Sequence, residues 1–221
     1  AAESIGRDDF FDVEVSPGLI YHRAPYGVAL VIEPSNYLTN AWWWMISALA
    51  AGNSIILKPS PKTPSCSLLI AEVALEAGVP KGLLQIIQAG DTPVPLLLEE
   101  SDVILMTGSK GAIRSVMAQV AQSGTPVIAE TNHISYAVIG KEADLDRAAK
   151  KLRQACALNG GRVCFRPQVI LIHSSRLWEF DAKFRGQLEQ PGPFVCISPT
   201  DRERIQGILT NWEREARRLS G

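Results

Sequence analysis

The sequence lacks an excess of charge of either sign, a very long apolar run and the cysteine density of a disulfide scaffold. Its 22 basic residues nearly balance its 23 acidic residues, and no basic stripe with interleaved aromatic residues is present, so nucleic acid is not an expected partner. No apolar run is long enough to span a membrane, and residues 1–9 lack the layout of a signal peptide. We therefore expect a soluble, cytoplasmic protein with no membrane partner.

Only four cysteines, Cys66, Cys156, Cys164 and Cys196, occur in 221 residues. They are too few for a disulfide framework in so long a chain, so we expect reduced thiols, with Cys156 a small buried side chain. No metal site is expected. The chain is instead rich in apolar residues, at 46%, and has no low-complexity tract. It can therefore bury a substantial core as one large domain or two smaller ones.

Apolar, β-branched runs alternate with helical patterns along the chain. The strand runs are continuously apolar, which is typical of a parallel sheet covered by helices on both faces. The fold class is therefore α/β. The predicted strands are 27–32, 54–58, 84–87, 103–106, 126–129, 136–139 and 168–172, and the predicted helices are 41–51, 64–77, 110–122, 144–158 and 201–219.

Two of these helices carry apolar residues that have more than one interpretation. Trp42, Trp43 and Trp44 point in three directions on one helix, and we expect core packing with one exposed ring. The helix 201–219 sets apolar residues at helical spacing against a charged face. We expect this helix to be docked on its own domain, with the sealing of a dimer as the alternative.

In such sheets ligands lie beyond the carboxyl ends of the strands, so the residues that follow each strand are considered first. Gly108 and Ser109 open the helix 110–122, where small residues and the helix dipole favour a phosphate; a simple helix cap is the alternative. Lys58 ends the strand 54–58 and could reach ribose or phosphate oxygens. A solvated surface lysine is the alternative there.

Three further side chains have the chemistry of a thiol-dependent reaction. The amide of Asn36, after the first strand, could donate to an oxyanion, or could belong to an ordinary turn. Glu130 ends the strand 126–129, where partial burial would raise its pKa toward that of a usable base; capping of the next element is the alternative. Cys164 follows paired glycines in a turn whose backbone N–H groups could support a thiolate, whereas most cysteines are small buried side chains.

The order and spacing of these segments resemble the aldehyde dehydrogenase superfamily. The resemblance runs through nearly the whole chain and includes the family's oxyanion turn, adenosine-side segment, pyrophosphate turn, general base and nucleophile loop. The matching segments are 25–28, 34–37, 48–53, 57–60, 76–82, 107–109, 130 and 160–164.

The resemblance implies a Rossmann-like dinucleotide-binding domain over 1–131, without the family's usual N-terminal helices and oligomerisation strand. The first part of a catalytic α/β domain would follow over 132–221. The cofactor would be NAD or NADP, and NADP stays open because Ser60 and Lys62, rather than a carboxylate, follow Lys58. The implied cofactor-binding residues are Glu33, Pro34, Lys58, Ser60, Gly108 and Ser109.

The resemblance also implies a reaction. Cys164 would attack an aldehyde, and the oxyanion would be held by Asn36 and the backbone N–H of Cys164. After hydride transfer, Glu130 would activate water to release the acid.

Three positions depart from the family's pattern. Ser35 stands where tryptophan is usual, and Asn132 and His133 stand where glycines usually follow the general base, so we expect an altered cofactor or substrate channel. The second glycine of the segment 107–113 comes early, as in the coenzyme A-acylating branch. A retained Glu130 favours water as the acyl acceptor.

The chain has about half of the family's usual length, and it contains no Glu-x-Phe-Gly-Pro segment, which in the family contacts the nicotinamide ribose. Three interpretations follow. The first is an NAD(P)-dependent aldehyde dehydrogenase, as a homo-oligomer or completed by another chain. The second is a catalytically inactive binding or assembly module, and the third is a fragment of a longer enzyme.

Overall fold

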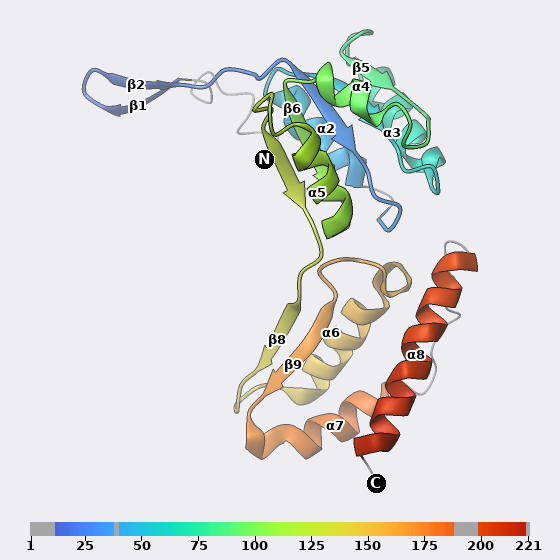
Figure 1. The fold of residues 1–221 in the computed structure, drawn as a ribbon. Coiled ribbons are helices and arrows are strands. Elements are labelled where there is room, and N and C mark those ends of the chain that lie inside the picture. The colour runs from blue at the N-terminus through green and yellow to red at the C-terminus, as the bar shows by residue number, and fades with distance from the viewer. Residues whose placement is uncertain (1–11, 38–39, 188–198, 220–221) are drawn as a thin grey trace. The chain divides into compact units, whose positions relative to one another are not determined.

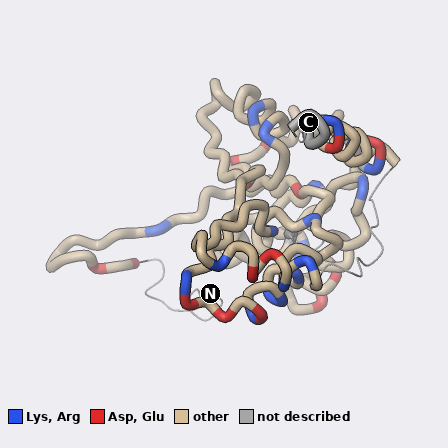
Figure 2. The backbone as a smooth tube through the Cα atoms, turned by 90° about the horizontal axis from the view of Figure 1, so that it is seen from below, with Lys and Arg blue, Asp and Glu red and all other residues tan. Residues whose placement is uncertain are grey.

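The computed structural model describes residues 12–37, 40–187 and 199–219, so Cys196 lies outside the described residues. Contacts divide the chain into two compact units, Ala1–Asn132 and His133–Gly221. Acidic and basic residues are interspersed along the backbone (Figure 2). No helix among the described residues is long and apolar enough to cross a membrane.

The first unit is built on a five-stranded parallel sheet with the order β5-β4-β3-β6-β7 (Figure 1). Within this sheet, the chain passes first through the central strand β3 and then outward through β4 to the edge strand β5. It returns to the other side of β3 with β6 and reaches the opposite edge with β7. The strand order therefore reverses between β3 and β6, which is where such sheets bind ligands. The strands are β3 (Val28–Ile32), β4 (Ser54–Lys58), β5 (Leu84–Ile86), β6 (Val103–Thr107) and β7 (Val127–Glu130).

Helices cover both faces of this sheet, which confirms the predicted fold class. The continuous apolar runs of the strands supply both cores: Val31 packs into one and Leu30 into the other, and both side chains are fully buried. The short helix over 94–99 was not predicted. One face is covered by α2 (Asn40–Ala50) and α3 (Pro64–Glu76), and the other by α4 (Val94–Glu99) and α5 (Lys110–Gln119).

Gly27, just before β3, lies where the start of β3 contacts the start of β6. Its φ is +127°, and a Cβ at this position would lie 2.3 Å from Oδ2 of Asp102. That same carboxylate oxygen accepts a hydrogen bond from the backbone N–H of Val28 at 2.7 Å. A side chain at position 27 would therefore break the contact that aligns the two strands.

A hairpin precedes the sheet and was not predicted. Strands β1 (Asp12–Ser16) and β2 (Leu19–His22) pair antiparallel around a two-residue turn in which Gly18 has a φ of 82°. All residues of both strands are exposed. The Pro-Gly pair flanked by short β-branched runs is the sequence signal that could have found this hairpin.

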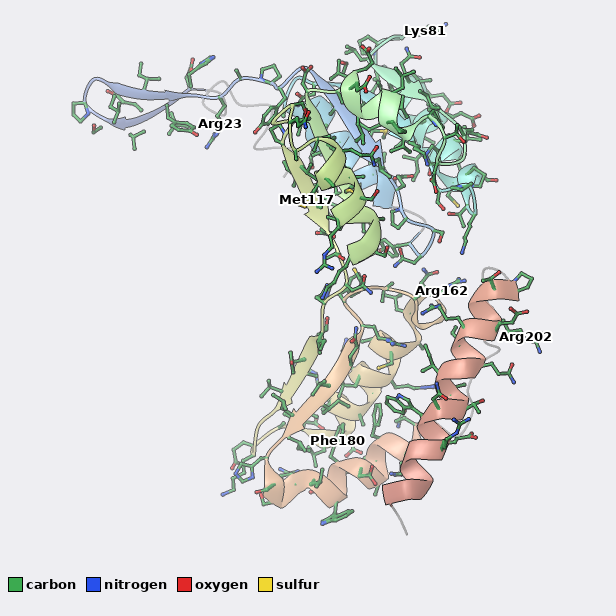
Figure 3. The ribbon with its side chains drawn as sticks, in the orientation of Figure 1. Arg23, Lys81, Met117, Arg162, Phe180 and Arg202 are labelled. Carbon is green, nitrogen blue, oxygen red and sulfur yellow. The ribbon has the colours of Figure 1, made fainter. Side chains whose placement is uncertain are left out.

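The second unit contains a two-stranded parallel sheet, β8 (Ser135–Ile139) and β9 (Pro167–Ile172). Its apolar core lies between the sheet and two helices, α6 (Leu145–Ala157) and α7 (Leu177–Gly186), and includes Phe180, which is labelled in Figure 3. The expectation that both faces are covered is wrong for this sheet, because Tyr136, Val138 and Leu171 are exposed. An apolar strand favours burial of both faces, but its sequence does not show whether another element packs on each face.

Two expectations about apolar helices are also wrong. Trp42 and Trp43 are both exposed, and only Trp44 is partly buried, where its Nε1–H donates to Oγ1 of Thr107 at 3.0 Å. The helix α8 (Pro199–Leu219) leaves Ile208, Leu209 and Trp212 exposed, so it is not docked through these residues. Helical spacing marks an apolar stripe, but it does not identify a surface for the stripe to contact.

Candidate functional site

Glu33 lies at the carboxyl end of β3 and is the one buried acidic residue among those that the structure describes, at 8% exposure. The hydroxyl of Ser67, on α3, donates to Oε2 of Glu33, and the Glu33 backbone N–H donates to the Lys58 carbonyl at 3.1 Å. Oε1 is buried and has no hydrogen-bond partner among the described residues. Burial raises the Glu33 pKa from 4.5 to about 7, although the Ser67 hydrogen bond lowers it. This carboxyl therefore exchanges its proton near neutral pH.

Lys58 ends β4, on the strand beside Glu33, and it is buried rather than solvated. Its Nζ lies 3.4 Å from Oδ1 of Asp91, and the Asp91 side chain is 95% exposed. The ion pair therefore joins a buried lysine to a carboxylate that is exposed to solvent. Sequence analysis missed Asp91, although it follows the predicted strand 84–87 at the edge where ligands are expected.

A hollow of about 270 Å³ lies at the carboxyl ends of β4 and β5, next to this pair. It contains Ser60, a predicted cofactor-binding residue, but no charged side chain lines it. Lys58 and Asp91 each adjoin a lining residue in sequence, Pro59 and Gly90 respectively. The lining residues are Pro59, Ser60, Pro61, Pro64, Gln88, Ala89 and Gly90.

Gly108 and Ser109 connect β6 to α5. Oγ of Ser109 accepts a hydrogen bond from the Ala112 backbone N–H at 3.2 Å, so the predicted alternative of a helix cap is present. The cap leaves the hydroxyl hydrogen of Ser109 able to donate, and the first N–H groups of a helix have no partner within the helix. The turn combines a cap with the donors that a phosphate requires.

Asn36 and Glu130 also lie beyond strand ends of the first unit. Asn36 is partly buried after β3, and Glu130 is the last residue of β7. The Glu130 carbonyl accepts from the backbone N–H of Gly108 at 3.0 Å, which places Glu130 next to the turn at Gly108 and Ser109. The expectation of partial burial is wrong, because the Glu130 residue is exposed at the edge strand of the sheet.

Cys164 lies in the second unit, where its loop is shaped by three successive left-handed residues. Asn159, Gly160 and Gly161 have φ values of 50°, 64° and 75°. They interrupt the short 3₁₀ segment η2 (Leu158–Gly161) that follows α6. A Cβ on Gly161 would lie 3.1 Å from the Cys156 carbonyl oxygen, so this glycine lets the loop pass close to the end of α6.

The residues around Cys164 fix this loop. Arg162, labelled in Figure 3, donates through Nε to the Asn159 carbonyl at 3.2 Å, and Val163 is buried at 4% exposure. Cys164 is exposed directly after Val163, whereas Cys156 is only partly buried, contrary to the expectation of full burial. The geometry anchors the backbone and presents the thiol to solvent.

The structure thus brings some predicted site residues together. Glu33 and Lys58 end adjacent strands, and Gly108 contacts Glu130. Cys164 belongs to the other unit, so its pairing with Glu130 and Asn36 stays a prediction. The roles of Pro34, Ser60 and Ser109 stay predictions as well.

A sequence profile of the aldehyde dehydrogenase family matches residues 8–210. A 3-sulfolactaldehyde dehydrogenase from Priestia aryabhattai is 34% identical over 199 residues, which are 89% of this chain and 41% of that protein. A 4-trimethylaminobutyraldehyde dehydrogenase from Sus scrofa is 37% identical over 171 residues, or 76% of this chain and 35% of that protein.

Solved structures give the same result. An aldehyde dehydrogenase from Mycobacterium tuberculosis, complexed with NAD⁺, superimposes with a TM-score of 0.84 at 28% identity, covering 93% of this chain and 46% of that chain. A γ-glutamyl-γ-aminobutyraldehyde dehydrogenase from Burkholderia cenocepacia gives a TM-score of 0.83 at 29% identity, covering 92% and 45%. The chain spans less than half the length of these relatives.

Proposed function

The chain belongs to the aldehyde dehydrogenase family, and on that premise we propose that it serves the NAD(P)-dependent oxidation of an aldehyde to a carboxylic acid. The observation that carries the proposal is the loop of Cys164. Three left-handed residues and the buried Val163 fix its backbone, and the thiol that follows is exposed. A buried structural cysteine needs no such loop.

The residues of the first unit fit a dinucleotide. Next to the hollow, the exposed carboxylate of Asp91, paired with the buried Lys58, offers an acceptor for ribose hydroxyls, and the turn at Gly108 and Ser109 offers donors for phosphate oxygens. The two sets lie at the carboxyl ends of strands in one parallel sheet. When bound, NAD or NADP accepts the hydride that leaves the aldehyde carbon.

The other steps belong to the chain's own side chains. Cys164, as the thiolate, forms a C–S bond to the carbonyl carbon, and the carbonyl electron pair moves to the oxygen. The Asn36 amide and the Cys164 backbone N–H donate hydrogen bonds to this oxyanion. Loss of the hydride leaves a thioester on Cys164.

Glu130 completes the cycle as the general base. Its carboxylate takes a proton from water as the water oxygen attacks the thioester, and the C–S bond breaks to release the acid and the thiol. Its exposed position at the end of β7 leaves it accessible to water. If coenzyme A is the acceptor instead, its thiol attacks the same thioester and Glu130 is not needed.

The proposal is tested by the reactivity of Cys164 in the full chain. Iodoacetamide at neutral pH is expected to modify Cys164 much faster than the partly buried Cys66, and NAD or NADP is expected to slow that modification and raise the melting temperature. Peptide mass spectrometry identifies the modified cysteine. Equal rates at the two cysteines, with no effect of either dinucleotide, would contradict the proposal.

The same sample distinguishes the alternatives. Dinucleotide binding without acid or acyl-coenzyme A from any of a panel of aldehydes indicates a binding module. Product only with coenzyme A identifies the acyl acceptor.

A further inference from the structure

We propose that Asp91 is a specificity-determining residue that accepts a hydrogen bond from the adenosine ribose and thereby selects NAD over NADP. This inference rests on the proposed function and deepens it, because nothing in the family membership alone decides between the two cofactors. It depends on the ion pair with Lys58 and on the hollow beside it.

The ion pair next to the hollow presents its carboxylate to solvent. The Lys58 side chain is 4% exposed, whereas the Asp91 side chain is 95% exposed, and the atoms Nζ and Oδ1 are 3.4 Å apart. The lysine is therefore buried and its partner carboxylate is exposed. A ligand that arrives from solvent meets the carboxylate together with the lysine, and not a free cation.

Asp91 lies at the strand end where a Rossmann-like sheet binds the ribose of the adenosine. Lys58 ends β4, the strand next to the central strand β3, and in a Rossmann-like sheet the residues at this strand end read the ribose of the adenosine. An acidic side chain there accepts from the 2′-hydroxyl of NAD, whereas a basic one accommodates the 2′-phosphate of NADP. In this chain no acidic residue follows β4 directly, but Asp91 reaches the same strand end from the loop after β5.

The hollow next to the pair offers room for the ribose. The hollow of about 270 Å³ next to the pair is lined by small and uncharged residues, among them Ser60 and Gly90. Oδ1 of Asp91 is engaged by Lys58, and the second carboxylate oxygen is in an exposed side chain that can accept from a hydroxyl. A 2′-phosphate in the same place would put two or nearly two negative charges beside this carboxylate, and Lys58 is already paired with it.

The test measures binding by isothermal titration of the full chain with ADP-ribose and with 2′-phospho-ADP-ribose. These probes carry the adenosine end without nicotinamide, so the readout is independent of activity. We expect ADP-ribose to bind at least 10-fold more tightly than its 2′-phosphate. Asp91→Asn is expected to lower this ratio by about 10-fold, and Asp91→Glu is expected to retain most of it, as expected for loss or retention of one charged acceptor.

Glu99→Gln is the matched control, since it removes one negative charge from an exposed position in the same unit. Equal affinities in the unchanged chain, or an Asp91→Asn ratio within twofold of the control ratio, would overturn the inference and leave the proposed function intact. Failure of both probes to bind the unchanged chain would overturn the proposed function as well. Asp91→Asn keeps a side-chain oxygen that can accept from the buried Lys58, and the melting temperature of each variant shows whether the fold is retained.

Discussion

Ser67 donates its hydroxyl hydrogen to Oε2 of Glu33, and both side chains are buried where α3 covers the end of β3. The other oxygen of the carboxyl has no partner among the described residues. Burial without full satisfaction disfavours the ionised form, and this is why the Glu33 pKa rises to about 7. Two predictions concern this pair.

Glu33→Gln is expected to remove a pH dependence of stability. The folded pKa of about 7 lies above the ordinary value of 4.5, so the unfolded chain ionises first as pH rises. The contribution of Glu33 to the free energy of unfolding is therefore fully present below pH 4.5, and it is lost as pH rises to about 7. At about 1.4 kcal/mol per pKa unit, the loss is on the order of 3 kcal/mol, and the glutamine variant escapes it.

Urea unfolding at pH 5 and pH 8 measures this effect as a difference between the variant and the unchanged chain. Glu72→Gln, at an exposed position of α3, is the control and is expected to show almost no such difference. Parallel pH profiles for the unchanged chain and Glu33→Gln would show that Glu33 does not titrate in this range.

Ser67→Ala is expected to destabilise the chain more at pH 8 than at pH 5. The substitution removes the donor to a buried carboxylate, which costs about 1–3 kcal/mol once the carboxyl is ionised. Because the Ser67 hydrogen bond lowers the Glu33 pKa, its loss also raises that pKa further. Ser65→Ala, at an exposed position of the same helix, controls for the change in helix composition. Thermal melts of both variants that match at each pH would contradict the prediction.

Gly161→Ala is expected to disturb the loop of Cys164. Alanine is strained at a φ of 75°, and its Cβ would lie 3.1 Å from the Cys156 carbonyl oxygen, so a destabilisation of about 1–2 kcal/mol is expected. We also expect a slower reaction of Cys164 with iodoacetamide. Gly186→Ala is the control, because nothing lies within 4 Å of its added Cβ. An equal labelling rate in both variants would show that the loop geometry does not set the reactivity of the thiol.

Glu130→Gln is expected to separate the two halves of the proposed reaction. The amide cannot take a proton from water, so an acyl group is expected to persist on Cys164 after mixing with an aldehyde and NAD or NADP. Intact-protein mass spectrometry after a short reaction measures this adduct, and Cys164→Ala, which cannot form it, is the control. Unchanged acid production by Glu130→Gln would exclude Glu130 as the base.

The central strands of the first unit, β3 and β6, could be predicted because they are buried on both faces. Leu30 and Ile104 are fully buried, and such positions leave a continuous apolar run in the sequence. The hairpin of β1 and β2 has no buried side, so apolarity could not indicate it. The helix α4 has six residues, which is too short for a helical period to show.

The candidate site divides in the same way. Cys164 could be found because the glycines that shape its loop adjoin it in sequence. The pairings of Asp91 and Ser67 could not be predicted, because each acts on a partner more than thirty positions away in the chain, Lys58 and Glu33 respectively. Only the fold brings such pairs together.

The left-handed run Asn159-Gly160-Gly161 has a consequence for protein engineering. The positive φ values of these three adjacent residues turn the chain between α6 and Cys164. The turn is therefore encoded within a short segment, which can be transferred to another protein. A graft of residues 159–164 onto another helix-to-strand connection would carry the direction of the thiol with it, provided that the recipient offers a pocket for Val163.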